Sequence, residues 1–453
     1  MRLTSEMPRI RDLLAAYRDG RITPAEALER TLADAEPWRQ PLRALVAVDR
    51  AGARAAAEES LGRIRRGNAR PLEGVPVMVK DLMDMRGQPT RFGTGWRVDP
   101  PTAGEDSAPV RRLREAGAVV FAKTRLLECA YGIVNPDDGP CWNPWDTLRT
   151  SGGSSSGSAA GTAAGIGYGG IGTDTGGSIR IPASYCGIYG LKPTVGLVET
   201  AGILPLAWTL DHVGPLCRTA TDLMPLMAGL TGLAPTPPAS PGRPRPRLGI
   251  LAPWGRDPVD DAVRDAFADL VRRLGAAGVD FVPVTVPELA AADPVLMTIC
   301  MAEAASVHRT WPHRHDVTYA ETTLQQIRAG EIIPAVDYIA ALRYRTRLQD
   351  AVERVLRTVD ALLLPTVGCP APAEDPVFGD GDAGSAESWF TGPFNVTGHP
   401  ALSCPWPRRD PSGLPLGAQL VARLGRDLAL CSLAEDLEAR LGWEPTLPQE
   451  PRT

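Results

Sequence analysis

The sequence lacks the cysteine pairs, the charge imbalance and the long apolar runs that characterise several classes of protein. Its eight cysteines include no Cys-x-x-Cys pair, which argues against a zinc site or a disulfide framework and fits a reducing compartment. The 48 Lys and Arg nearly balance the 53 Asp and Glu, giving a net charge of −5, so we expect no nucleic-acid partner. No run reaches the roughly 18 continuous apolar residues of a membrane span. The polar start, Met1–Glu6, does not resemble a secretory signal. We therefore expect a cytoplasmic protein with no membrane partner.

What is present is the balance of an ordinary globular chain, with 43% hydrophobic and 22% charged residues. Short apolar runs alternate with amphipathic stretches, a pattern that indicates an α/β fold with a largely buried sheet. One helix start is explicit, because Thr23, Pro24 and Glu26 form a capping box with proline at the first helical position. The predicted strands are 73–79, 117–123, 248–251, 279–284 and 361–364, and the predicted later helices are 259–277 and 336–359. The amphipathic pattern of 259–277 predicts that Val263, Phe267, Leu270, Val271 and Leu274 are buried.

Two segments rich in glycine and serine carry the strongest chemical signal. Thr150–Ala160 reads TSGGSSSGSAA, and Gly172–Pro182 reads GTDTGGSIRIP. Consecutive glycines allow unusual backbone dihedral angles. Placed just before a serine, they can expose several backbone N–H groups on one side, which is the arrangement of an oxyanion hole beside a nucleophile.

Simpler motif interpretations of these segments are weaker. Residues 153–157 match G-x-S-x-G, but a nucleophile elbow needs a preceding strand, which we do not predict, and His399 is a poor candidate for the histidine of a Ser-Asp-His triad. Residues 167–172 match G-x-G-x-x-G, but no strand is predicted before them and no acidic residue lies about 20 residues further on, so a dinucleotide site is not supported. The sequence contains no phosphate-binding G-x-x-x-x-G-K-[ST] motif.

The spacing of the motifs is more specific than any one of them. Lys80, at the end of a predicted strand, precedes Ser154 by 74 residues, and Ser178 follows Ser154 by 24. Taken together, these positions resemble the amidase signature family, over about residues 8–445. The other matching segments are Asn143–Asp146, Gly190–Thr194, Leu210–Leu216 and Phe394–Leu402.

The resemblance implies a Ser–Ser–Lys hydrolase without a metal or another cofactor. By matching positions, Ser178 is the nucleophile, Ser154 bridges it to Lys80 through a cis Gly153–Ser154 peptide, and neutral Lys80 is the general base. The oxyanion hole corresponds to the backbone N–H groups of Thr175, Gly176, Gly177 and Ser178. An ordinary lysine, with a pKa near 10.4, is almost fully charged at pH 7, so burial must lower its pKa by about 3 units.

The same resemblance implies the fold and the domain organisation. We expect one amidase-signature domain over residues 1–453, an α/β fold with a mixed, twisted central sheet and helices on both faces. Its expected parts are N-terminal helices (about 8–70), a signature core (about 71–232), a proline-rich connector (234–247) and a C-terminal α/β part (248–445). Within the last part, residues 369–392 are rich in Pro, Gly, Asp and Ser and predict a long loop.

Residues other than the proposed catalytic groups give less information. Met83, Tyr131 and Trp208 are candidates for the substrate pocket by position. We interpret Asp174 and Arg180 as polar groups that hold the nucleophile loop. We interpret His313–Asp316 as a solvated stretch rather than a metal site.

These features favour a neutral alkyl or aryl amide as substrate, with carbamates or esters as further possibilities and a monomer or homodimer as the active form. Two alternatives stay open. One is the A subunit of a tRNA-dependent amidotransferase, which usually carries a Tyr-Tyr segment where this chain reads AVDYIAALR (335–343). The other is a non-catalytic binding protein on the same fold.

Overall fold

The computed structural model describes residues 9–234, 245–255, 258–374, 387–407, 409–443 and 446–450. Most of the predicted connector 234–247 and the middle of the predicted loop 369–392 lie outside the described residues.

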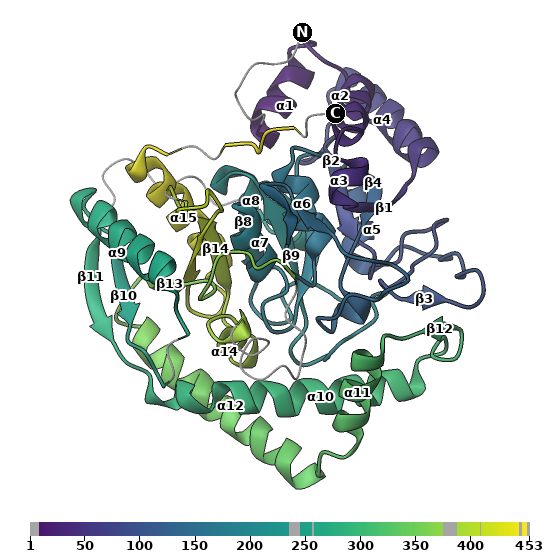
Figure 1. Cartoon of the computed structure of the whole chain (residues 1–453). Helices are drawn as coiled ribbons and strands as arrows, with labels where there is room; N and C mark the ends of the chain where they lie inside the picture. Colours follow the sequence, from purple (N-terminus) through teal and green to yellow (C-terminus); the bar gives the residue numbers. More distant parts are fainter. Residues whose placement is uncertain are drawn as a thin grey trace.

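One mixed sheet of eleven described strands runs through the molecule (Figure 1). Strand β2 pairs in parallel with both β4 and β7, and β10 pairs in parallel with both β11 and β13, whereas the other described pairs are antiparallel. In sheet order the strands are β1 (Leu45–Val48), β4 (Val119–Thr124), β2 (Pro76–Lys80), β7 (Gly170–Asp174), β9 (His212–Cys217), β8 (Tyr189–Lys192), β14 (Ala401–Pro405), β15 (Gly417–Val421), β13 (Ala361–Pro365), β10 (Arg247–Leu251) and β11 (Asp280–Val284).

All five predicted strands are present in this sheet, with bounds that differ from the prediction by at most three residues. The shift matters at β2, because the strand extends to Lys80 itself rather than ending one residue before it. The region predicted to hold only N-terminal helices also contains a strand, β1, which pairs with β4 at the edge of the sheet. Only four residues long, β1 carries too short an apolar run to be separated from helix by pattern alone.

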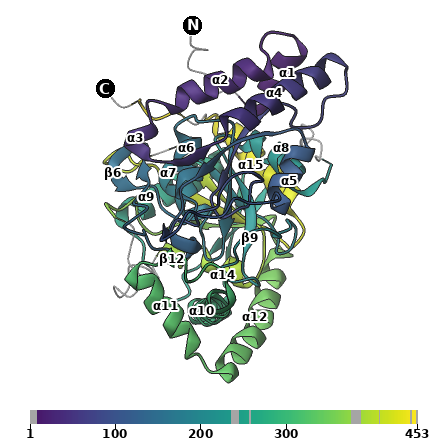
Figure 2. The ribbon, with the colours of Figure 1, turned by 90° about the vertical axis from the view of Figure 1, so that its right-hand side faces the viewer.

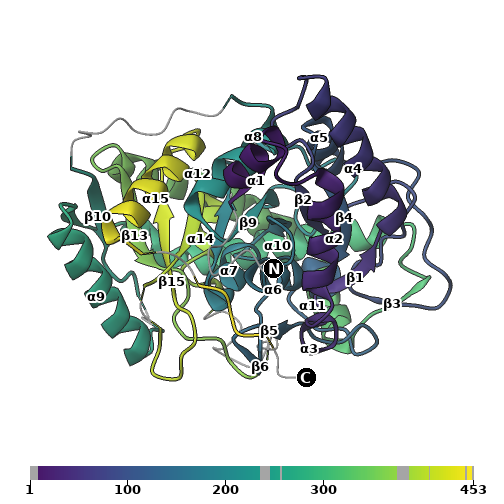
Figure 3. The same ribbon diagram turned by 90° about the horizontal axis from the view of Figure 1, so that it is seen from above.

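Helices cover both faces of the sheet, as expected. The alternation of side chains along a strand divides the core: Val77 and Val79 of β2 pack under one set of helices, whereas Met78 packs under the other. The first set comprises α1 (Ile10–Arg18), α5 (Ala108–Glu115), α8 (Ala220–Thr231), α9 (Asp261–Ala276) and α15 (Asp427–Leu441). In Figure 3, α9 lies beside β10, at the end of the sheet away from β2 and β4.

The prediction for α9 is wrong at two positions. Val263, Leu270 and Leu274 are buried, but Phe267 and Val271 are only partly buried. The helix covers the last strands of the sheet, so its apolar stripe extends beyond the core that is available to it. Phe267 instead contacts Trp406, with ring centroids 6.1 Å apart.

The second face is covered by two groups of helices. One packs on the β4–β2–β7 part of the sheet, where α2 begins with the predicted Thr23–Glu26 capping box. It consists of α2 (Pro24–Ala35), α3 (Arg39–Leu42), α4 (Arg50–Arg65), α6 (Ser156–Ala163) and α7 (Arg180–Cys186). The other packs on β13 and β15 and consists of α10 (Ala292–Thr310), α11 (Glu321–Glu331), α12 (Ala335–Leu356) and α14 (Gly392–Val396).

One helical stretch, Pro287–Thr310, is long and apolar enough to cross a membrane by length and composition. It comprises a 3-10 turn, η2 (Pro287–Ala291), followed by α10. In Figure 2, α10 lies between α11 and α12, and Leu296, Ile299 and Ala304 are buried in the core there. This is the packing of a core helix, so the composition of this stretch gives only weak evidence for a membrane span.

Short elements complete the fold and correct one further expectation. A strand does precede Gly153, because β5 (Trp142–Asn143) and β6 (Asp146–Thr150) form a hairpin. This hairpin lies outside the central sheet, so the strand–turn–helix of a nucleophile elbow is still not formed. The remaining short elements are β3 (Gly95–Trp96), which pairs with β12 (Val317–Thr318), and the 3-10 turn η1 (Glu128–Ala130).

Candidate active site

Lys80 lies at the end of β2 and is completely buried. Its Nζ is 2.8 Å from Ser154 Oγ and 2.8 Å from Thr173 Oγ1, the latter on the neighbouring strand β7. Burial lowers the pKa of Lys80 to about 7, although the negative charges of Asp174 and Asp211 act in the opposite direction. Near pH 7 a large fraction of Lys80 is therefore neutral and able to accept a proton.

The first glycine- and serine-rich segment crosses the end of β7. Its Gly153–Ser154 peptide is cis, the geometry that the family resemblance implied, and a Cβ on Gly153 would collide with Leu127. Ser155 Oγ donates to the carbonyl of Thr173 and accepts from its N–H, at 3.0 and 3.2 Å. The Ser155 N–H also donates to the carbonyl of Ser178 at 3.1 Å. Ser155 thus fixes Ser154 relative to both β7 and the second segment.

The second segment turns sharply between β7 and α7. Gly177 has a φ of +144°, and a Cβ there would collide with Thr391, so the turn requires glycine. In the part of the chain that the structure describes, the N–H groups of Thr175, Gly176, Gly177 and Ser178 donate to no acceptor. Four adjacent donors without partners provide the hydrogen-bonding capacity that an oxyanion needs.

The predicted bridge between the two serines is only half formed. Ser154 is within hydrogen-bonding distance of Lys80, but no hydrogen bond joins the Ser154 and Ser178 hydroxyls among the described residues. Ser178 is partly exposed, unlike the buried Ser154.

A buried ionic network holds the nucleophile loop. Arg180 and Asp174 are both fully buried and are paired at 2.9 Å. Asp174 also accepts from the N–H of Ile179 at 3.1 Å, so its carboxylate closes the turn around Ser178. Burial alone would raise the pKa of Asp174, but the charge and hydrogen bonds of Arg180, together with the Asn395 amide, hold it well below its usual range. The loop-holding role predicted for Asp174 and Arg180 agrees with these contacts.

Sequence reasoning missed the distant half of this network. Arg180 also donates to the Thr391 carbonyl (2.8 Å), to Gln419 Oε1 (2.6 Å) and to Asn395 Oδ1 (2.5 Å). With two hydrogen bonds to Asp174, all five guanidinium N–H donors have acceptors. The segment around Asn395 matched the family pattern, but no local signal showed that it contacts Arg180.

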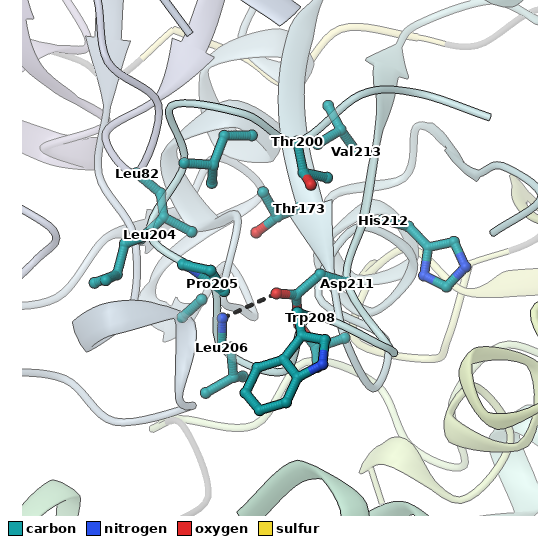
Figure 4. A pocket seen from close by; sticks show the side chains of 13 residues that line it. Leu82, Thr173, Thr200, Leu204, Pro205, Leu206, Trp208, Asp211, His212 and Val213 are labelled. Atoms are coloured by element: carbon teal, nitrogen blue, oxygen red, sulfur yellow. Dashed lines mark hydrogen bonds between the residues drawn. The ribbon is translucent and has the colours of Figure 1, made fainter. Parts of the chain in front are cut away.

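A small cavity opens beside these segments (Figure 4). Thr173 and Thr175 lie on its wall, and the other lining residues are mostly apolar. Of the three predicted pocket residues, Trp208 lines the cavity, whereas Met83 and Tyr131 do not. Their chain neighbours, Leu82 and Ala130, occupy those places, and Met83 is fully buried in the core. The further lining residues, which no local pattern identified, are Thr200, Ile203, Leu204, Pro205, Leu206, Asp211, His212 and Val213.

Other polar candidates have structural partners. His399 is buried and lies 3.2 Å from Glu353 through its Nε2. His313 and Asp316 are 3.3 Å apart, and the His313 ring packs against Trp96 and Trp311. Among the described residues, no group of three His, Cys, Asp or Glu side chains could hold a metal ion.

Comparison with known proteins identifies the family. The sequence model of the Amidase family matches residues 26–431. An amidase of Pseudomonas putida is 37% identical over 405 residues, covering 85% of this chain and 86% of that protein. The A subunit of the glutamyl-tRNA(Gln) amidotransferase from Anaeromyxobacter sp. (strain K) is 33% identical over 475 residues, covering 94% of this chain and 95% of that protein. The crystal structure of an amidase superposes with a TM-score of 0.86 at 36% identity, covering 96% of this chain and all of that chain. The chain therefore belongs to the amidase family and is an enzyme that acts on amides.

Proposed function

We propose that this chain acts on its own as an amide hydrolase through an acyl-enzyme on Ser178. The observation that carries the proposal is a buried lysine with a pKa of about 7, placed 2.8 Å from the Ser154 hydroxyl. A serine hydroxyl is a weak nucleophile until a base removes its proton. A lysine held largely neutral can act as that base without histidine.

The proposed steps follow from this arrangement. With substrate bound, the Ser178 hydroxyl turns toward Ser154, and its proton passes to Ser154 as the Ser154 proton passes to Lys80. Ser178 Oγ attacks the carbonyl carbon, and the N–H groups of residues 175–178 stabilise the oxyanion. The C–N bond breaks as the proton returns through Ser154 to the departing amine. Water then repeats the sequence at the ester and releases the acid.

The cavity lining favours a neutral substrate. Leu82, Ile203, Leu204 and Trp208 give it a mainly apolar surface. Thr173, whose hydroxyl contacts Lys80, is among its polar lining residues. We propose alkyl or aryl amides as the main substrates. Carbamates and esters are additional candidates, because the same acyl-enzyme chemistry applies to them.

Substitution of Ser178 tests the nucleophile. Product release would be measured with anilides, aliphatic amides, aryl carbamates, p-nitrophenyl esters and glutamine. We expect Ser178→Ala to lower kcat/KM for every substrate by at least about 10³-fold, since both the covalent route and its proton transfer are lost. Ser156→Ala, in the neighbouring segment, is the matched control and should keep near-normal activity. Turnover that survives Ser178→Ala would refute the nucleophile assignment.

The pKa of Lys80 predicts the pH profile. Only neutral Lys80 can accept the proton, and a pKa of about 7 makes roughly one tenth of it neutral at pH 6 and nine tenths at pH 8. We expect kcat/KM to rise about tenfold over this range. Burial also raises the pKa of Asp211 to about 7. The pH profile must therefore be measured at several temperatures to show which of the two groups titrates. The pKa of an ammonium group falls on warming, whereas that of a carboxyl group hardly changes. If the pH at which kcat/KM rises does not change with temperature, the titrating group is not Lys80.

The amidotransferase interpretation is the second candidate, since the A subunits are similar over most of the chain. It predicts Ser178-dependent ammonia release from glutamine and little turnover of anilides or carbamates. Hydrolysis of anilides by the isolated chain, with glutamine inert, would favour the stand-alone amidase.

A further inference from the structure

Trp208 has an exposed indole at the junction of two hollows. The residue is 52% exposed, and in Figure 4 the ring lies on the opposite side of the cavity from Thr200 and Val213. It lines both the cavity beside Thr175 and a separate open groove. Small-molecule sites in proteins are concave and are lined mainly by hydrophobic and aromatic side chains.

The two hollows differ greatly in size. The cavity beside Thr175 has a volume of about 30 Å³, which is little more than the space of one water molecule. The groove has a volume of about 560 Å³, within the range of small-molecule sites. It lies between α10, the end of α11 and the start of α12. Its wall combines the apolar residues Ala302, Ala305, Ile333 and Ala335 with the polar residues Glu303, Ser306, Arg309, Glu331 and Tyr338.

The segment that carries Trp208 is fixed from the cavity side by Asp211. This carboxylate accepts from the N–H of Leu206 at 2.9 Å and from the N–H of Ala207 at 3.1 Å. It also accepts from the hydroxyl of Thr175 at 2.5 Å. The support of Trp208 is therefore joined directly to the loop that carries Ser178.

The same segment is fixed from the groove side by Glu303, which is 1% exposed. Glu303 accepts from the N–H and the hydroxyl of Thr209, at 3.0 and 2.7 Å, and from Tyr338 at 2.8 Å. Arg345 donates to the Thr209 carbonyl at 2.7 Å. Trp208 thus extends, between cavity and groove, from a backbone that is held on both sides.

We propose that the groove is a second substrate subsite and that Trp208 selects amides with an extended apolar or aromatic substituent. This inference rests on the proposed function. The cavity admits only small groups, so a longer substituent on the substrate must extend elsewhere, and the Trp208 ring leads from the cavity to the groove. When an apolar chain packs on the indole and on Ala302, Ala305 and Ile333, its surface is removed from water. This removal favours binding in proportion to the apolar area buried.

Two homologous series of substrates test this proposal. One lengthens the acyl chain of an anilide, and the other lengthens the amine of a short-chain amide. We expect kcat/KM of the wild type to rise with length in at least one series. Trp208→Ala should lower kcat/KM for the longest members at least about tenfold more than for the shortest, mainly through KM, because buried aromatic area is lost. Trp208→Phe should keep most of the length dependence.

A groove-filling variant tests the subsite without changing Trp208. Ser306 is exposed and lines the groove, whereas Thr310, one turn later on α10, is exposed and does not line it. Ser306→Trp should remove the preference for long substrates, and Thr310→Trp should leave it intact. Ser178-dependent activity that is independent of chain length in both series would overturn the subsite alone. If no substrate is hydrolysed, or if hydrolysis survives Ser178→Ala, the proposed function fails and the subsite with it.

Discussion

Lys80→Met is expected to abolish turnover and, at pH 7, to make the folded chain more stable. Methionine has a similar length and volume but accepts no proton, so the proposed proton transfer to Ser154 is lost. General bases contribute roughly 10² to 10⁴ in rate. We expect kcat/KM to fall by about 10³ or more, measured on the best substrate of the panel.

The gain in stability follows from the pKa of Lys80. The unfolded chain protonates this lysine with a pKa of 10.5, whereas burial lowers the folded value to about 7. Between these values the unfolded state binds more protons, so the lysine opposes folding, and the opposition weakens as pH rises toward 10.5. At pH 7 the cost is on the order of 4 kcal/mol. Methionine removes this cost. The gain in stability is smaller than the full cost, because the hydrogen bonds to Ser154 and Thr173 are lost, at about 1 kcal/mol each.

Urea unfolding of wild type and Lys80→Met at pH 7 and pH 9.5 measures this effect, with a larger gain expected at pH 7. Lys123 provides the matched control, because it is also buried near the end of a neighbouring strand but is paired with Asp81 at 2.5 Å. Lys123→Met leaves that carboxylate without its counter-ion and should destabilise the fold by about 3–5 kcal/mol. A loss of stability for Lys80→Met at pH 7 would mean that burial lowers the pKa of Lys80 much less than to about 7.

The parts of the site that could be predicted from the sequence are those encoded locally. The apolar run before Lys80 predicts a buried strand that ends near it, and consecutive glycines predict the turn that leads to Ser178. In the structure, the Lys80–Ser154 contact spans 74 residues, and only the resemblance to a family, not any periodicity, predicted it. A sequence shows which residue types occur and how far apart they are along the chain. The contact between Lys80 and Ser154 depends instead on β2 and β7 being neighbours in the sheet.

The parts that could not be predicted depend on which residues face one another across the fold. Met83 and Tyr131 were placed in the pocket by position, yet Leu82 and Ala130 line it. A difference of one residue along an irregular segment is enough to exchange a pocket residue for a core residue. Similarly, the contacts of Arg180 with Asn395 and Gln419 span 215 and 239 residues. No local sequence pattern around Asn395 or Gln419 indicates that its side chain contacts Arg180.

Arg180→Met is expected to be among the most destabilising single substitutions in the chain. It leaves Asp174 charged and buried without its counter-ion, and it also deprives Gln419 and the Thr391 carbonyl of their donor. Removing one partner of a buried ion pair costs about 3–5 kcal/mol, which urea unfolding would measure. Arg149→Met, at a partly exposed arginine, should cost less than about 1 kcal/mol.

Two further variants separate charge from geometry in this network. Adding Asp174→Asn to Arg180→Met removes the orphaned charge and should recover part of the lost stability, because a neutral amide is less costly to bury. Arg180→Lys keeps the positive charge but has three donors instead of five and no planar fork. Since those donors connect the Ser178 loop to α14 and β15, we expect Arg180→Lys to lose most of its kcat even where it remains folded. Normal kcat in a folded Arg180→Lys variant would mean that charge alone positions the nucleophile.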